Sequence, residues 1–318
     1  MGALINRVFL AQYGPRDFTG DDSATLYLGS QALAFTTDSF VVDPLFFPGG
    51  DIGRLAVAGT VNDLLTAAAR PLALAASFII EEGLAIETLA TIAASMRQAA
   101  DESGVAIVTG DTKVVPKGLA DKVFITTTGL GLVVRPGVSG AAASPGDKII
   151  LTGSVGDHGT AVMLAREKLL EGENIESDVA PLNELVLKLL EAGCEIHAMR
   201  DPTRGGIAAS LNEIARQSKV SLKIEESQVP LKPGVAAACE ALGLDAFQVA
   251  NEGKMLIFVA PGDAPRALSL ARQSRYGGEA RIIGEVGAKP GGRVLVRTLI
   301  GTTRILDPPA GELLPRIC

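Results

Sequence analysis

Residues 51–80 read DIGRLAVAGTVNDLLTAAARPLALAASFII, and this stretch decides the class of fold. Residues 51–69 predict a helix because their apolar side chains recur at helical spacing, as at Ile52, Leu55, Ala56, Val61, Leu64 and Leu65. Residues 71–80 carry no charged side chain and predict a buried strand. A helix that runs directly into a buried strand is typical of α/β architecture.

The same alternation continues on both sides of this stretch. Two strands joined by a turn near Gly29 are predicted within residues 24–42, a helix within 87–100, and strands within 105–109 and 123–134. Beyond the turn-rich segment 136–146, strands are predicted at 149–152, 195–199, 222–224, 255–259 and 281–286. Helices are predicted at 181–192, 205–217 and 235–241, and one more follows the glycine-rich loop 153–159. We therefore expect an α/β fold in both halves of the chain.

Length and composition fit two globular domains and a tail. The 318 residues exceed one ordinary core and suit two domains of roughly 150 residues each. Hydrophobic residues make up 47% and charged residues 20%, which favours packed structure over disorder. Because the junction falls at 136–146, we expect one domain at residues 1–140 and a second at 147–306. Residues 307–318 are rich in proline and lack periodicity, so we expect a mobile tail.

The charge of the chain argues against several kinds of partner. Lys and Arg number 29 and Asp and Glu 36, which gives a net charge of −7. A negative chain without a basic run is a poor candidate for binding nucleic acid or an anionic membrane. Despite a mean hydropathy of +0.30, the apolar run 71–80 is about half the length that a membrane span needs. The N-terminus lacks the layout of a signal peptide, so we expect a cytoplasmic protein.

Acidic residues in the first half stand where predicted elements end. They are Asp21, Asp22, Asp38, Asp63 and Asp111. Each of them alone is best explained as a turn or helix-cap residue. As a set they favour a metal site, because converging carboxylates repel one another unless cations lie between them. Magnesium with the phosphates of ATP fits such oxygen ligands.

Four further segments offer chemistry in a local context that is less specific. Gly110-Asp-Thr-Lys113 follows a strand, and its lysine could neutralise phosphate or lie on a surface hairpin. The loop 153–159 could hold an anion, but a tight strand–helix turn is the favoured explanation, because the loop matches neither the Walker loop nor the dinucleotide fingerprint. Asp201-Pro-Thr-Arg-Gly-Gly206 and Asn251-Glu-Gly-Lys254 place opposite charges beside glycines, where a capping turn is the simpler explanation.

The three cysteines divide into two kinds. Cys194 and Cys239 lie in apolar surroundings and are expected to be buried. A sparse, odd set of cysteines argues against disulfides and against structural zinc. Cys318 is the last residue, so it is not a prenylation box, which requires three residues after the cysteine. The proline-rich run before it forms an arm that could swing Cys318 into a cleft.

Together these motifs resemble the hydrogenase maturation factors of the HypE family. That family belongs to the PurM-like superfamily of aminoimidazole ribonucleotide synthetase, with selenophosphate synthetase and thiamine-phosphate kinase. The segments that carry the resemblance span nearly the whole chain: Gly20-Asp-Asp-Ser-Ala24, residues 37–53, Val61-Asn-Asp63, Gly110-Asp-Thr-Lys-Val-Val115, Gly156-Asp-His-Gly159, Asp201-Pro-Thr-Arg-Gly-Gly206, Asn251-Glu-Gly-Lys254 and Pro315-Arg-Ile-Cys318. The acidic motifs occur across the superfamily, whereas the C-terminal Pro-Arg-Ile-Cys separates HypE from its relatives.

The resemblance implies a fold, a reaction and a set of partners. The N-terminal domain is expected to dimerise by joining sheets, with ATP in the resulting cleft. A HypF-type carbamoyltransferase would place a carboxamide on Cys318, and ATP-dependent dehydration would turn it into a thiocyanate. A HypC–HypD complex would then accept the cyanide for the NiFe site of a hydrogenase.

The resemblance also implies roles for individual residues. The catalytic set would be Cys318 with Lys113 and Glu252, the latter two deprotonating nitrogen. The residues contacting ATP would be Asp21, Asp22, Asp38, Asp63, Asp111, Thr112, Asp201 and Arg204. Of these, the magnesium ligands would be Asp21, Asp38, Asp63 and Asp111.

Two other functions remain open at this point. A sister enzyme, such as a thiamine-phosphate kinase or an amidine-forming ligase, would act on a free small molecule and would not need Cys318. A non-catalytic thiol carrier would use Cys318 only to present a group to its partners, and its acidic loops would be structural. ATP hydrolysis that depends on carbamoylation of Cys318 would separate the three functions.

Overall fold

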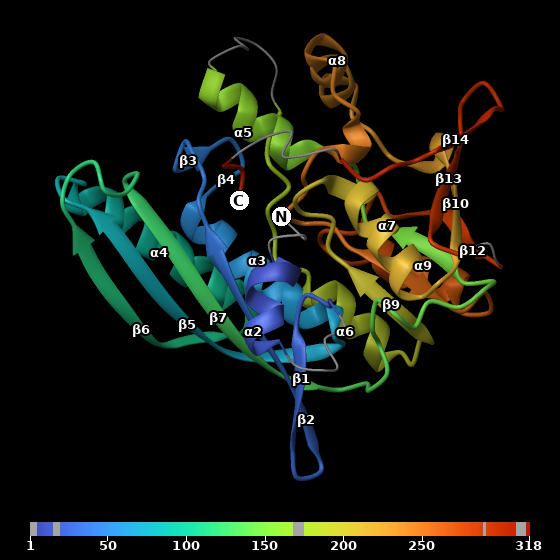
Figure 1. The fold of residues 1–318 in the computed structure, drawn as a ribbon, viewed down its shortest axis with the longest axis horizontal. Coiled ribbons are helices and arrows are strands. Elements are labelled where there is room, and N and C mark those ends of the chain that lie inside the picture. Colours follow the sequence, from blue (N-terminus) through green and yellow to red (C-terminus); the bar gives the residue numbers. More distant parts are fainter. Residues whose placement is uncertain (1–4, 15–19, 168–174, 289–290, 310–315) are drawn as a thin grey trace.

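The computed structural model describes residues 5–14, 20–167, 175–288, 291–309 and 316–318 (Figure 1). The chain forms two α/β halves, each built on a mixed sheet, so the predicted fold class is confirmed. Within the described residues, no helix is both long and apolar enough to cross a membrane. Residues 307–309 and 316–318 contain neither helix nor strand, and residues 310–315 of the predicted mobile tail lie outside the described part.

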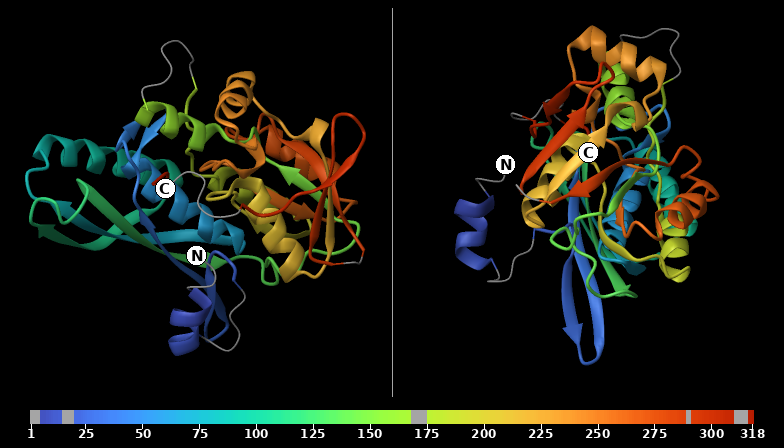
Figure 2. Two further views of the ribbon diagram at one scale, coloured as in Figure 1. Left: turned by 45° about the horizontal axis from the view of Figure 1, so that its top comes forward. Right: turned by 90° about the vertical axis from the view of Figure 1, so that its right-hand side faces the viewer.

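The first half contains a five-stranded sheet in the order β1-β2-β7-β5-β6. Its strands are β1 (Ala24–Leu28), β2 (Gln31–Phe40), β5 (Ala69–Glu81), β6 (Ala106–Val115) and β7 (Val123–Val133). Only β5 and β6 pair in parallel. Buried and partly exposed residues alternate along β7, because one face of the sheet packs on α3 (Ile52–Thr66). Figure 2 shows that the β1–β2 hairpin projects away from the body of the molecule.

The helix α3 is buried on nearly all sides. Asp51 caps its N-terminus, because the carboxylate accepts hydrogen bonds from the amides of Gly53 and Arg54 at 2.7 and 3.2 Å. The second helix, α4 (Ile86–Ser103), packs against it so closely that a Cβ on Gly53 would lie 2.5 Å from the carbonyl oxygen of Ile92. On its other side α3 contacts the second half of the chain at α6 (Asn183–Glu191) and β9 (Ile196–Arg200).

The second half contains a seven-stranded sheet in the order β14-β13-β10-β12-β8-β11-β9. Besides β9, its strands are β8 (Lys148–Leu151), β10 (Ser221–Glu225), β11 (Leu256–Val259), β12 (Arg281–Gly287), β13 (Arg293–Arg297) and β14 (Thr303–Ile305). Besides α6, its helices are α5 (Asp157–Glu167), α7 (Gly206–Gln217), α8 (Pro233–Leu242) and α9 (Ala264–Arg272). The remaining short elements are η1 (Ile5–Leu10), α2 (Ala11–Tyr13), β3 (Phe46–Phe47), β4 (Gly50–Asp51), η2 (Glu226–Gln228) and η3 (Ala246–Gln248).

Most predicted elements are confirmed, including the hairpin, α3, α4 and β5. The prediction for residues 105–109 was too short, because β6 continues through Lys113 to Val115 in parallel pairing with β5. The helix α9 and the strands β13 and β14 were not predicted from the sequence. The domain boundaries expected at residues 140 and 147 stay a prediction. The two sheets are built from residues 24–133 and 148–305.

Candidate active site

Three carboxylates from distant parts of the chain converge between the two halves. Asp22 precedes β1, Asp63 lies in α3, and Asp201 follows β9. One carboxylate oxygen from each of them lies within 4.8 Å of the others. Arg200 forms an ion pair with Asp22 at 3.0 Å, and the hydroxyl of Thr36 lies 2.9 Å from an oxygen of Asp63. The α/β topology therefore builds one acidic cluster from three separate motifs.

The acidic cluster is short of positive charge. Burial raises the pKa of Asp22 and of Asp63 well above the usual aspartate value, and the neighbouring carboxylates raise both further. Burial also raises the pKa of Asp201, to about 6, although Arg200 acts in the opposite direction. Within the described part of the chain, Asp22 Oδ2 is buried without a hydrogen-bond partner. Carboxylates in this state suit a hard divalent cation such as magnesium.

A cavity of about 250 Å³ adjoins the cluster. It is lined by Asp22, Thr37, Asp38, Gly59, Asp63, Asp201, Thr203, Arg204, Glu252 and Cys318. Arg204 is the one cation among these lining residues. Burial raises the pKa of Asp38, although its hydrogen bond with the amide of Ser39 and the charge of Arg204 lower it. The cavity is therefore strongly acidic, and one arginine faces it.

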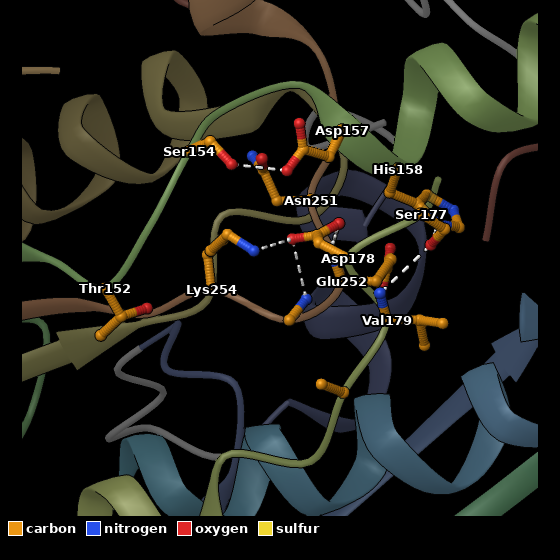
Figure 3. Close-up of polar contacts among 12 residues, drawn as sticks. Thr152, Ser154, Asp157, His158, Ser177, Asp178, Val179, Asn251, Glu252 and Lys254 are labelled. Atoms are coloured by element: carbon orange, nitrogen blue, oxygen red, sulfur yellow. Dashed lines mark hydrogen bonds and ion pairs between the residues drawn. The ribbon is translucent and has the colours of Figure 1, made fainter. Parts of the chain in front are cut away.

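Glu252 is held in this cavity through its backbone. Asp178 accepts hydrogen bonds from the amides of Glu252 and Gly253, both at 3.2 Å, and pairs with Lys254 at 3.1 Å (Figure 3). The amide group of Asn62 in α3 donates to the carbonyl oxygen of Glu252 at 3.3 Å. A Cβ on Gly253 would lie 1.8 Å from the carbonyl oxygen of Asp178, so this close approach requires glycine. The motif at 251–254 is thus clamped from both halves of the molecule.

The side chain of Glu252 is an unusual carboxyl group. It is 3% exposed, and within the described residues its Oε1 has no hydrogen-bond partner. Burial raises its pKa well above the usual value, and the charges of Asp201, Asp178 and Asp38 raise it further. A buried carboxyl group with a raised pKa that lines a cavity is a candidate for proton transfer.

The C-terminal residue returns to this cavity. Arg204 donates a hydrogen bond to Cys318 Sγ at 3.2 Å. Burial raises the pKa of the Cys318 thiol to about 12, and Glu252 adds to the rise while Arg204 opposes it. Figure 2 shows the C-terminus between the two halves of the molecule. The sulfur atom therefore lies where Glu252 and Arg204 face the cavity.

The residues that the sequence analysis proposed as a site fall into two groups. Asp22, Asp38, Asp63, Asp201, Arg204, Glu252 and Cys318 line one cavity. Asp21, Asp111, Thr112 and Lys113 do not line it. Asp21 instead accepts hydrogen bonds at 2.8 Å from the hydroxyl of Ser139 and the amide of Gly140, in the segment that joins the two halves. Asp111 and Thr112 border a separate cavity of about 430 Å³ beside β6.

Two proposed groupings therefore do not form within a single chain. The four aspartates proposed as magnesium ligands include Asp21 and Asp111, whereas the carboxylates that converge are Asp22, Asp63 and Asp201. Lys113 was proposed beside Glu252, but it lies on the edge strand β6 with 69% of its side chain exposed. There it pairs with Asp111 at 2.8 Å, since residues two apart in a strand share a face.

Sequence reasoning missed residues that support the site. Thr37, Gly59 and Thr203 line the cavity, and Asp178 clamps Glu252. Thr37 directly precedes Asp38 and Thr203 directly precedes Arg204, so proximity in sequence to proposed residues could have found them. Cys194 and Cys239 are buried as predicted.

Comparisons with known proteins agree with the observed architecture. The family described as AIR synthase related protein, N-terminal domain, matches residues 20–133, and its C-terminal domain matches residues 144–297. Carbamoyl dehydratase HypE of Rhizobium leguminosarum bv. viciae is 50% identical, covering 100% of this chain and 92% of the relative. A crystal structure of a HypE–HypF complex matches with a TM-score of 0.91 and 48% identity, over 97% of this chain and 100% of that chain. A crystal structure of HypE in complex with ATP matches with a TM-score of 0.88 and 45% identity, over 100% of this chain and 96% of that one. The chain belongs to the carbamoyl dehydratase HypE family, within the AIR synthase related proteins.

Proposed function

We propose that this protein catalyses the ATP-dependent dehydration of a carboxamide on Cys318 to a thiocyanate, which supplies cyanide for NiFe hydrogenase maturation. The observation that carries the proposal is the position of Cys318 Sγ, in an acidic cavity that Glu252 also lines. The similarity to HypE bound to ATP supports ATP as the second substrate. A thiol that only presented a group to partner proteins would not need this cavity.

Overall, the reaction removes the elements of one water from the carboxamide: its oxygen leaves in the phosphate, and both protons leave the nitrogen. The carboxamide oxygen attacks the γ-phosphorus of ATP, ADP leaves, and one proton leaves the nitrogen. The resulting O-phosphoryl imidate then loses phosphate and the second nitrogen proton, which forms the carbon–nitrogen triple bond. Phosphorylation is needed because an amide oxygen is a poor leaving group and phosphate is a good one.

Glu252 and Arg204 have complementary roles in this proposal. Glu252 accepts a proton from the nitrogen, because its Oε1 is buried, has no partner within the described residues and lines the cavity that holds the sulfur. Arg204, which donates to Cys318 Sγ, orients the loaded sulfur toward Glu252. The clamp from Asp178 and Asn62 keeps the backbone of Glu252 in place.

Asp22, Asp63 and Asp201 fit a magnesium site. Their oxygens converge within 4.8 Å, and burial disfavours their ionised forms unless a cation lies among them. A magnesium ion bound there would neutralise these carboxylates and the phosphates of ATP. Asp38 lines the same cavity and is placed to contact the nucleotide.

We further propose that the protein is a homodimer joined through its first sheet. Residues 106–114 of the edge strand β6 are exposed along their whole length, including Val108 at 64% and Val114 at 65%. An apolar edge strand favours pairing with another chain. Lys113, Asp111 and Thr112 lie on this strand, so a second copy would bring them to a site shared between chains. Lys113 stays a candidate for proton transfer only in such a dimer.

The proposed partners are the proteins that load Cys318 and that accept the cyanide from it. A HypF-type carbamoyltransferase loads the thiol, and the structure of the HypE–HypF complex supports this partner. A HypC–HypD complex is the proposed acceptor of the cyanide. Both exchanges require Cys318 to leave the cavity, so the tail has an inward and an outward position.

A single-turnover assay tests the proposed function. The chain is loaded by the carbamoyltransferase, mixed with magnesium and ATP, and followed by intact mass. Glu252→Gln should load normally but lose water about a hundredfold more slowly than the unaltered chain, the usual scale for a general base. Glu240→Gln on the exposed face of α8 is the matched control and should react normally. Equal rates in both variants would remove Glu252 from the mechanism.

A further inference from the structure

The two residues before Cys318, Arg316 and Ile317, make contacts outside the acidic cavity. Arg166 donates to the carbonyl oxygen of Arg316 at 2.6 Å, and the side chain of Arg316 pairs with Asp121. The side chain of Ile317 is 5% exposed. These contacts hold the approach of the tail, but none of them fixes the peptide that directly precedes Cys318.

His158 makes that contact. It lies in the first turn of α5, fully buried, and its Nε2 is 2.9 Å from the carbonyl oxygen of Ile317. A carbonyl oxygen can only accept, so Nε2 must carry the proton. The other ring nitrogen, Nδ1, then accepts from the hydroxyl of Ser177 at 2.8 Å (Figure 3). Burial lowers the pKa of His158, which keeps the ring neutral and suits this tautomer.

Both partners of the histidine ring are fixed by the fold. The hydroxyl of Ser177 accepts from the amide of Val179 at 3.1 Å, so its own proton is directed at His158. The amide of Ser177 donates to the carbonyl oxygen of Pro48 in the first half of the chain at 2.8 Å. The ring of His158 also packs edge-on against Phe47, with centroids 5.3 Å apart. The direction of the Nε2 donor is therefore set by contacts that lie outside the tail.

The same loop supports Glu252. Ser177 orients His158, and the next residue, Asp178, binds the amides of Glu252 and Gly253. One short segment thus sets the position of Ile317, which carries Cys318, and of the carboxyl group that faces it. We propose that His158, oriented by Ser177, is the positioning residue that latches the backbone of Ile317 and so holds Cys318 in the cavity lined by Glu252.

This inference rests on the proposed function only where it predicts a change in the rate of dehydration. The latch itself concerns where Cys318 lies, and it predicts that a loaded tail without the latch reaches the cavity less often. Dehydration would then slow down, whereas loading by the carbamoyltransferase, which needs the tail outside, would not.

Alkylation of the unloaded chain with iodoacetamide tests the latch. The peptide that ends at Cys318 is released with a glutamyl protease, which cuts after Glu312, and is then quantified by mass. His158→Phe keeps an aromatic ring but loses the donor, and should raise the alkylation rate of Cys318 about tenfold, the scale of one buried hydrogen bond. His158→Gln restores a donor and should return the rate toward that of the unaltered chain. Ser177→Ala leaves the ring in place but unoriented, and should raise the rate by a smaller factor.

The buried Cys194 and Cys239 report on the fold in the same experiment and should stay unreactive in every variant. Equal rates at Cys318 in the unaltered, Phe and Gln forms would overturn the latch. Equal acceleration by Phe and Gln would also overturn it, because the donor would then be irrelevant. Acceleration at all three cysteines would assign His158 to general stability instead. If the unaltered, loaded chain failed to lose water with ATP, the proposed function would fall while the latch would still be judged by alkylation.

Discussion

Replacing Asp178 with Asn measures how much the buried contacts of this carboxylate with Lys254 and with the backbone of Glu252 contribute to stability, compared with an exposed ion pair. Asp178 is 2% exposed at its side chain and Lys254 10%, and they pair at 3.1 Å. The two amides of Glu252 and Gly253 also donate to this carboxylate. Asn keeps the shape and one accepting oxygen but removes the charge, so Lys254 is left buried without its counter-ion.

The expected loss of stability follows from this burial. Removing one partner of a buried ion pair costs about 3–5 kcal/mol, because an uncompensated charge remains. An unfolding entropy of about 2.1 cal/mol/K per residue gives this 318-residue chain about 1.5 °C per kcal/mol, so the melting temperature should fall by about 4–8 °C. Burial alone would raise the pKa of Asp178, but the charge of Lys254 and the hydrogen bond from the amide of Glu252 outweigh it and lower the pKa. A lowered pKa means that the contribution is present above the ordinary aspartate pKa and is lost as the pH falls through the folded value.

The assay is thermal unfolding of Asp178→Asn beside Glu285→Gln. Glu285 pairs with Lys148 at 2.9 Å, but both side chains are more than a third exposed, so that loss should stay below about 1 kcal/mol. The gap between Asp178→Asn and the unaltered chain should narrow in acid, and single-turnover dehydration should slow because Glu252 loses its support. Equal melting shifts in the two variants, or a gap that does not depend on pH, would refute this account of the clamp.

Three further predictions concern the cavity and the edge strand. Asp63→Asn should weaken magnesium–nucleotide binding in calorimetry yet raise the melting temperature of the metal-free protein at neutral pH. Burial and neighbouring carboxylates raise the pKa of Asp63 in the folded protein. Its contribution to folding stability is therefore fully present below the ordinary aspartate pKa and is lost as the pH rises through the raised value. A lower melting temperature with unchanged nucleotide affinity would contradict this. Lys113→Ala should stop dehydration in the dimer but still be loaded, whereas Lys117→Ala should be loaded and dehydrated normally. Normal turnover in both variants would exclude Lys113 from the reaction. The alkylation rate of Cys318 should keep increasing with pH beyond 9.0, the ordinary thiol pKa, because burial raises the pKa of this thiol to about 12. A rate that levels off near pH 9.0, as in a free peptide, would show that the thiol is not held in the cavity.

Local periodicity was enough to predict most of the fold. The apolar spacing in residues 51–69 and the uncharged run 71–80 determine α3 and β5, and both formed where expected. Lys113 shows where local pattern fails. A lysine beside an aspartate after an apolar run looked like a strand end, but parallel pairing with β5 carries β6 past it. Tertiary pairing, which local sequence does not encode, decided that strand's length.

The residues of the candidate site that lie in the motifs of the family resemblance could be predicted from the sequence, whereas residues that reach the site through long-range contacts could not. Asp63 was predicted as part of the acidic set, and it lies in the acidic cluster although it belongs to the helix α3, where aspartate is a poor helix former. Asp178 belongs to no motif, and its clamp on Glu252 depends on a contact 74 residues away in sequence. His158 lies in the loop 153–159, whose local sequence carries no sign of this contact, because its partner Ile317 is 159 residues further along the chain.

The most direct test of the central claim is the intact mass of the carbamoylated chain before and after magnesium and ATP are added. The account predicts that the mass falls by one water in step with one ADP and one phosphate released, and that Cys318→Ala neither gains the carboxamide nor hydrolyses ATP in response to the partner. A loaded chain whose mass stays constant while ATP is consumed, or a Cys318→Ala variant that is still carbamoylated, would contradict it.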